Sequence, residues 1–255
     1  MIDRAYFLLC RGLAWILRSA RYSRARVEDR RPGVVLKRRA FYAPVLIWMG
    51  GLVVRVLDTG IRILATREWV ERERQIYKEL RRGQIEVDRD GTVVLPYLAG
   101  ETLAALLENL SLDESSRKKA IERAAVALAE FHRLGFTHAD AMAENVLVDL
   151  DAGVAHWFDF ETVHAPDRSI TWKRADDVRA LVGTCLVRTV PEKLQDTLNI
   201  IVNAYTDRDV TRLLAMSFTS VWRRSLAIHL AQAGLSFERF HEIGRLLREP
   251  MEVQA

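Results

Sequence analysis

Residues 135–161 read GFTHADAMAENVLVDLDAGVAHWFDFE, and this stretch decides how the whole chain is interpreted. It supplies a carboxylate, an amide and a second carboxylate in the order Asp140, Asn145, Asp159. Two short runs of strand-forming residues, 146–148 and 155–158, separate Asn145 from Asp159 and predict a hairpin. Because the two arms of a hairpin lie side by side, we expect these two side chains to meet at its base.

The order and spacing of these groups are typical of phosphoryl transfer from ATP, in which the protein positions the reactants and compensates charge. We expect Asp140 to orient an acceptor hydroxyl and to take its proton. Asn145 and Asp159 carry the oxygen ligands that Mg²⁺ prefers beside phosphate oxygens. The structural alternative is that Asp140 and Asn145 only cap turns. We assign His138 to the same catalytic loop, as a buried histidine that braces it rather than as a metal ligand.

A lysine and a glutamate farther upstream fit the same chemistry. Lys37 ends the run Val-Val-Leu-Lys, and a lysine on such a strand can reach the α- and β-phosphates. Glu73 lies on the apolar face of a helix predicted over 66–82, where a carboxylate needs a partner. The alternatives are that Lys37 belongs to a solvated basic run, or that Arg55 is the strand cation. Periodicity does not separate strands from a buried helix between residues 40 and 64.

The remaining pattern predicts an α+β chain with strands concentrated early and helices late. A hairpin is expected around Asp90-Gly91, and helices over 101–109 and 115–134. From about residue 173 onward the chain reads as helical, with breaks at Pro191, 207–209 and Gly234. Asp177 opens the first of these late helices. It is expected either to accept hydrogen bonds from the catalytic-loop backbone or to serve as an ordinary acid in a first helical turn.

Composition restricts the setting. The chain has 255 residues, 49% of them hydrophobic, and a net charge of +4 with the basic residues crowded into the first third. Such a cluster suits an anionic surface, and the alternative is a solvated segment; we expect a membrane rather than nucleic acid as a partner. Cys10 and Cys185 have no paired spacing, so a reducing cytoplasm is the default location. Residues 1–22 predict an amphipathic helix that lies either in a membrane interface or against its own domain.

At these residues the chain resembles the protein-kinase-like superfamily, from about Val34 to Val190. More narrowly it resembles small atypical members: lipopolysaccharide core kinases, RIO-type kinases and aminoglycoside phosphotransferases. The run VLPYLAGETLAALL (94–107) resembles the last strand of an N-lobe, the hinge and the following helix. The resemblance implies that Asp140 is the catalytic base and that Asn145 and Asp159 bind magnesium. It also implies that Lys37 and Glu73 form the pair that holds the phosphates. The backbone that contacts adenine would then be that of Pro96, Tyr97 and Leu98.

That resemblance also implies a two-lobed fold with a reduced N-lobe sheet and a mainly helical C-lobe. Residues 1–33 are then a basic helix and connector, 34–97 the N-lobe and 98–255 the C-lobe. The pattern departs from protein kinases at several positions. No glycine-rich loop is visible, the interval between Lys37 and Glu73 must hold an insertion, and Glu161 stands where protein kinases have glycine.

These departures favour one function and leave others open. We expect an ATP- and Mg²⁺-dependent kinase that acts on a hydroxyl of a lipid, glycolipid, sugar or other small molecule, in the cytoplasm and at the inner face of a membrane. The alternatives are a pseudokinase that serves as a nucleotide-binding or scaffolding module, an atypical Ser/Thr protein kinase, and a metal-dependent hydrolase built on His138, Asp140 and Asp159.

Overall fold

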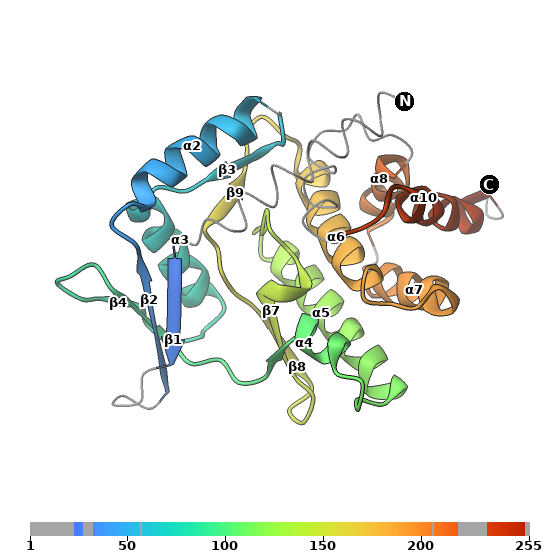
Figure 1. The fold of residues 1–255 in the computed structure, drawn as a ribbon, viewed down its shortest axis with the longest axis horizontal. Helices are drawn as coiled ribbons and strands as arrows, with labels where there is room; N and C mark the ends of the chain where they lie inside the picture. The colour runs from blue at the N-terminus through green and yellow to red at the C-terminus, as the bar shows by residue number, and fades with distance from the viewer. Residues whose placement is uncertain (1–22, 28–32, 57, 206, 219–233, 253–255) are drawn as a thin grey trace.

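The computed structural model describes residues 23–27, 33–56, 58–205, 207–218 and 234–252. It confirms the α+β class, since small antiparallel sheets are combined with a predominantly helical remainder (Figure 1). The helix predicted over residues 1–22 lies outside the described residues. None of the described helices is both long and apolar enough to cross a bilayer. The division of the chain into two lobes stays a prediction.

Four antiparallel strands form the first sheet, in the order β1-β2-β5-β4. They are β1 (Ser23–Val27), β2 (Val34–Arg39), β4 (Glu86–Val87) and β5 (Val93–Pro96). The predicted hairpin around Asp90-Gly91 is confirmed as β4–β5. The interpretation of residues 1–33 as helix and connector is wrong for β1, which pairs with β2 from Ser23↔Arg39 to Val27↔Val35. Residues 23–27 form a strand despite their polar composition because they pair with the backbone groups at the outer edge of β2.

The ambiguous segment 40–64 contains a helix followed by a short strand. Helix α2 (Ala43–Val56) begins one residue before Pro44, a position that suits a proline because the first-turn N–H groups have no helical partner. Arg55 lies exposed in the last turn of α2, so its interpretation as a strand cation is wrong. Strand β3 (Ile61–Ile63) follows, and together α2 and β3 form the predicted insertion between Lys37 and Glu73.

Helix α3 (Thr66–Glu79) buries the predicted face, including Trp69, Glu73 and Ile76. Its N-cap is Ala65, and the Glu68 carboxylate accepts the Ala65 N–H at 3.2 Å. This glutamate therefore caps the first turn from inside the helix, which is the N3 half of a capping box.

A second set of strands carries the catalytic stretch. Strands β6 (Glu101–Thr102), β7 (Val146–Asp149) and β8 (Val154–Trp157) form an antiparallel sheet, next to helices α4 (Leu103–Glu108) and α5 (Glu114–Arg133). The predicted hairpin is β7–β8, and a 3₁₀ turn, η1 (Ala143–Asn145), leads into it. Strand β9 (Thr162–His164) pairs with β3, with Ile61 opposite His164, and thereby joins the insertion to the chain just after Asp159.

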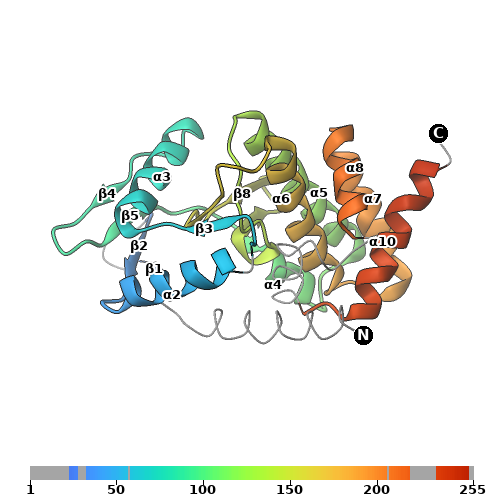
Figure 2. The ribbon, with the colours of Figure 1, turned by 90° about the horizontal axis from the view of Figure 1, so that it is seen from above.

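The helical remainder confirms the predicted break at Pro191, and the next break ends at Asp207, the N-cap of a helix that already contains Asp209. It comprises α6 (Ile170–Leu186), η2 (Pro191–Lys193), α7 (Leu194–Ala204), α8 (Arg208–Ser217) and α10 (Phe237–Glu252). Residues 175–186 of α6 are all buried, because α5, α7 and α8 pack around this helix. Figure 2 shows α7, α8 and α10 at one end of the molecule and α2 toward the other. Helix α6 is therefore a rigid support for any loop bonded to its N-terminal half.

Candidate active site

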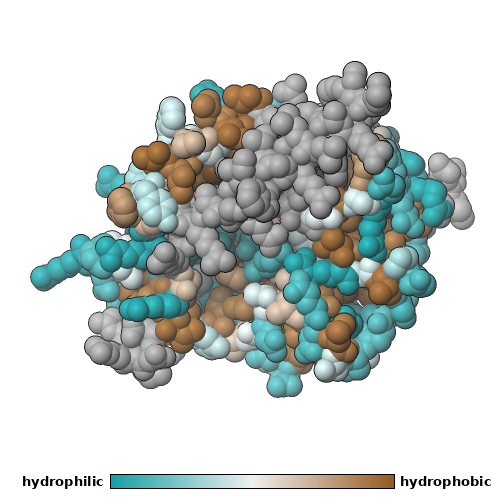
Figure 3. Space-filling model, viewed as in Figure 1, coloured by the Kyte–Doolittle hydropathy of each residue, from teal (hydrophilic) through white to brown (hydrophobic). Residues whose placement is uncertain are grey.

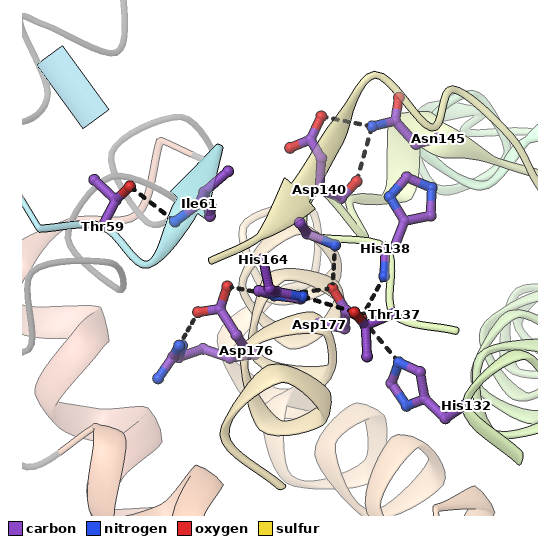
Figure 4. A network of polar contacts seen from close by, with 12 residues as sticks. Thr59, Ile61, His132, Thr137, His138, Asp140, Asn145, His164, Asp176 and Asp177 are labelled. Atoms are coloured by element: carbon purple, nitrogen blue, oxygen red, sulfur yellow. Dashed lines mark hydrogen bonds and ion pairs between the residues drawn. The ribbon is translucent and has the colours of Figure 1, made fainter. Parts of the chain in front are cut away.

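Asp140 and Asn145 are in direct contact. The Asn145 side-chain amide donates to the backbone oxygen of Asp140 at 2.8 Å and to its carboxylate Oδ2 at 2.9 Å (Figure 4). Both amide hydrogens are thus used to hold one residue. An asparagine has two donors and one acceptor oxygen, so Oδ1 remains as the atom of Asn145 that can serve a cation.

Asp159 follows β8 at the base of the hairpin. The Phe158 N–H donates to the Asn145 carbonyl at 3.0 Å, which brings the two predicted metal ligands to the same end of β7–β8. Asp159 has φ +67°, a left-handed conformation that is unfavourable for a residue with a side chain. Its side chain is 37% exposed, whereas the neighbouring Phe160 is fully buried. The sharp bend therefore separates an outward carboxylate from an inward ring.

Lys37 reaches this carboxylate from β2. Its ammonium forms an ion pair with Asp159, lies 2.7 Å from Glu161 Oε1 and 3.9 Å from Glu73 Oε1. Burial by itself lowers the pKa of Lys37, but the carboxylates of Asp159, Glu161 and Glu73 outweigh it and raise that pKa above its usual value. Lys37 is therefore a permanent cation among three carboxylates, and the interpretation as a solvated basic run is wrong for this residue.

Glu73 is held from its own helix and from the catalytic stretch. The Trp69 indole N–H donates to Glu73 Oε1 at 3.0 Å, and the Phe160 N–H donates to the same oxygen at 3.3 Å. Burial raises the pKa of Glu73, against the lowering effect of Lys37 and these hydrogen bonds. Its second oxygen, Oε2, is buried without a hydrogen-bond partner in the described part of the chain. A buried carboxylate oxygen without a hydrogen bond is an acceptor that calls for a donor.

Asp177 confirms the predicted contact with the catalytic-loop backbone. Its carboxylate accepts the N–H groups of His138 and Ala139, each at 2.7 Å, and also bonds His132 Nε2 at 2.9 Å (Figure 4). Burial raises the pKa of Asp177, yet the three surrounding histidines hold it well below its usual range. Ala139 has φ +67°, so Asp177 stabilises a strained loop immediately before Asp140.

His138 lies on the inner side of the same loop. Its Nε2 is 2.9 Å from the Phe158 carbonyl, and because that oxygen can only accept, Nε2 carries the proton and donates. The ring is fully buried against Trp157 and Phe160, and burial lowers its pKa to about 4. His138 is therefore a neutral brace. Among the described residues no group of three or more His, Cys, Asp or Glu side chains is arranged to hold a metal ion.

The predicted hinge follows β5. Pro96 ends that strand, and the Tyr97 N–H donates to the Gly33 carbonyl at 2.8 Å. Tyr97 is exposed and Leu98 half-buried. The Tyr97 amide is thus engaged with the start of the strand that carries Lys37.

Two contributors at the site were not predicted from the sequence. Glu161 was noticed only as a departure from glycine, yet it lies closer to Lys37 than Glu73 does. Its other oxygen is 3.4 Å from the guanidinium of Arg39, which is buried on β2 and lies over the Trp69 ring. The available signal was the alternation of β2: Lys37 and Arg39 are two residues apart, so both face the same side of a strand.

The sequence also matches the model of a known protein family. The model of the lipopolysaccharide kinase (Kdo/WaaP) family matches residues 27–216, from the end of β1 to the last turn of α8. This match covers the residues of the site from Lys37 to Asp177. No curated protein matches the chain.

Proposed function

The chain belongs to the lipopolysaccharide kinase (Kdo/WaaP) family, whose members phosphorylate sugar hydroxyls, and from this premise we propose that it transfers the γ-phosphoryl group of ATP to a sugar of a membrane-anchored lipopolysaccharide precursor. The observation that carries the proposal is the pair of hydrogen bonds from Asn145 to Asp140, beside the Lys37–Asp159 ion pair. Since ATP is a cytoplasmic substrate, the reaction belongs at the inner face of the membrane.

Asp140 is the base in this proposal. A sugar hydroxyl bound near its carboxylate gives up its proton to Asp140 as the new O–P bond forms, and the bond between the γ-phosphorus and the bridging oxygen breaks to release ADP. Asn145 and Asp177 position this base from opposite ends: Asn145 bonds its carboxylate, and Asp177 holds the two residues before it. His138 braces the loop through Phe158 and does not touch the reacting atoms.

Asn145 and Asp159 would hold Mg²⁺. The donor set fits, because Asn145 retains one amide oxygen and Asp159 offers a partly exposed carboxylate. Magnesium typically takes one or two protein carboxylates and completes its shell with phosphate oxygens and water. When bound, the ion neutralises charge on the β- and γ-phosphates.

Lys37 and Glu73 would grip the phosphates. The ammonium of Lys37 is a cation at any working pH. When it moves from Asp159 toward the α- and β-phosphates, the Glu73 carboxylate, 3.9 Å away, would remain its partner. Residues 23–97 would form the N-lobe, with β1 included, and residues from 98 onward the C-lobe. Adenine would lie against the backbone of Pro96, Tyr97 and Leu98.

The test is transfer of radiolabelled γ-phosphate to a Kdo-containing glycolipid, with a generic protein acceptor and no acceptor in parallel. Asp140→Ala should lose transfer while it retains nucleotide binding, and Asp159→Ala should also lose the magnesium-dependent part of nucleotide binding. Asp151→Ala is the matched control, since Asp151 is exposed in the β7–β8 turn. Full transfer by Asp140→Ala would overturn the mechanism. Nucleotide binding without transfer would favour a pseudokinase, and labelling of the protein acceptor would favour a protein kinase.

A further inference from the structure

Helix α2 has an inverted distribution of apolar residues. Its buried positions are Ala43, Gly50 and Val54, so the side that packs onto the protein carries small side chains. Its exposed positions carry large ones. A helix on the surface of a soluble protein normally turns its large apolar residues inward and its polar residues toward water.

The exposed face is extensive. Trp48 is 70% exposed, Val45 60%, and Met49 and Leu52 52% each, at the spacing i, i+3, i+4, i+7 of one helical face. Two aromatic residues just before the helix and one valine at its end continue the surface: Phe41, Tyr42 and Val56. We call these seven residues the α2 face. In Figure 3 hydrophobic atoms gather at the upper left, where Figure 1 places α2. Contiguous apolar patches of this kind mark interaction sites.

The charges around the α2 face favour one kind of binding partner. Residues 40–57 contain no Asp or Glu, and their only charge is Arg55, which is exposed in the last turn of the helix. Arg38 before the helix and Arg67 after it are exposed as well, although Arg38 is ion-paired with Asp90 at 3.1 Å. The acidic residue that directly follows this segment, Asp58, forms an ion pair with Arg168. An apolar surface with aromatic residues and flanking cations is complementary to an anionic bilayer, where rings occupy the headgroup region and arginines meet phosphates.

The position of α2 links this face to the site. Helix α2 packs against β3, and β3 is hydrogen-bonded to β9, which begins three residues after Asp159. The Leu64 N–H also donates to the Glu161 carbonyl at 2.9 Å. If α2 is bound to a surface, these contacts therefore keep the end of the catalytic stretch at a constant distance from that surface.

We propose that the α2 face docks the enzyme on an anionic phospholipid bilayer, with Trp48, Met49 and Leu52 inserted at the headgroup boundary. This rests on the proposed function in one respect: a kinase whose acceptor sugar is anchored in a membrane must work at the membrane surface. Docking through α2 needs neither ATP nor catalysis.

The experiment is flotation of the full-length protein with phosphatidylglycerol–phosphatidylethanolamine vesicles, without nucleotide. The variant Trp48→Ser/Met49→Gln/Leu52→Gln should lower vesicle partitioning by roughly tenfold or more, because it removes the inserted side chains. The matched control Leu110→Gln/Val190→Asn changes two exposed apolar residues elsewhere and should partition like the wild type. Asp140→Ala should also bind vesicles normally, so loss of kinase activity and loss of docking are separate results.

A second measurement does not depend on how well the triple variant folds. Phospholipids brominated in their acyl chains should quench tryptophan fluorescence of the wild type, and Trp48→Phe should remove more of that quenching than Trp15→Phe while it preserves flotation. Unchanged flotation of the triple variant, or unchanged quenching in Trp48→Phe, would overturn the proposal. So would a wild-type dimer in size-exclusion chromatography that the triple variant converts to a monomer, because the face would then bind a second copy.

Discussion

Asn145 fastens Asp140 at two points, the carboxylate Oδ2 at 2.9 Å and the backbone oxygen at 2.8 Å. These bonds fix both the position of the residue and the direction of its side chain. Because Asn145 lies five positions after Asp140, at the end of the 3₁₀ turn, the contact also closes this loop on itself. The same asparagine thus holds the predicted base with its nitrogen and keeps its side-chain oxygen for the predicted cation.

Asn145→Asp tests this double role. The change puts a second carboxylate within hydrogen-bond distance of Asp140 and replaces two hydrogen-bond donors by acceptors. The new carboxylate therefore repels the Asp140 carboxylate that the amide had bonded. Displacement of a catalytic group by about 1 Å costs on the order of 100-fold in rate. We therefore expect kcat for phosphate transfer to fall by about 100-fold or more. Steady-state kinetics checks it, with Asn199→Asp on the exposed side of α7 as the charge-matched control. Equal kcat values for the two variants would contradict the role of Asn145.

Glu161→Gln tests the network around Lys37. Glu161 bonds two buried cations, Lys37 at 2.7 Å and Arg39 at 3.4 Å, and the glutamine leaves both with less compensation. Breaking a buried ion pair by neutralising one partner destabilises a protein by about 3 kcal/mol. We expect a loss of that order in the free energy of unfolding in urea, together with a higher KM for ATP as Lys37 loses an anchor.

The control is Glu122→Gln, which removes the same charge from the exposed side of α5. Adding Arg39→Met to each variant completes a double-mutant cycle, and the coupling energy between Arg39 and Glu161 should be about 1 kcal/mol or more. A coupling energy indistinguishable from zero would show that the contact contributes nothing to stability.

The predictable parts of the site are those whose residues lie close together in the sequence. The stretch from His138 to Glu161 carries its residues at short separations on one loop and one hairpin, so spacing alone brought Asp140, Asn145 and Asp159 together. Asp177 was harder, because its partners are 38 and 39 residues away, but an acid in the first half of a buried helix has few uses other than to receive backbone N–H groups.

The parts that were missed depend on tertiary contacts. Glu161 and Lys37 are 124 positions apart, and no local pattern distinguishes a glutamate that meets a lysine from one that faces water. Strand β1 was hidden by its basic composition, since pairing with β2 and not hydrophobicity makes it a strand. Helix α2 was ambiguous because an apolar run with large residues outside and small ones inside has no ordinary amphipathic period.

His138 predicts how stability depends on pH. Its pKa is about 4 in the folded protein against 6.5 for an ordinary histidine, so between these values the unfolded chain binds a proton that the folded chain refuses. The stability that the neutral ring contributes is complete above pH 6.5 and is lost as the pH falls toward 4, by about 3 kcal/mol over the window. Asp177, whose pKa is lowered, loses its contribution only below the ordinary carboxyl value of 3.8, outside this window.

His138→Gln isolates this effect, since glutamine keeps an N–H donor for the Phe158 carbonyl but does not titrate. Unfolding in urea at a series of pH values from 7 to 4 should show a shallower decline for His138→Gln than for the wild type, with a difference of about 3 kcal/mol at the acid end. His241→Gln, which changes an exposed histidine on α10, should follow the wild-type curve. Parallel curves for all three proteins would mean that His138 titrates normally in the fold and that its ring is not the neutral brace of the catalytic loop.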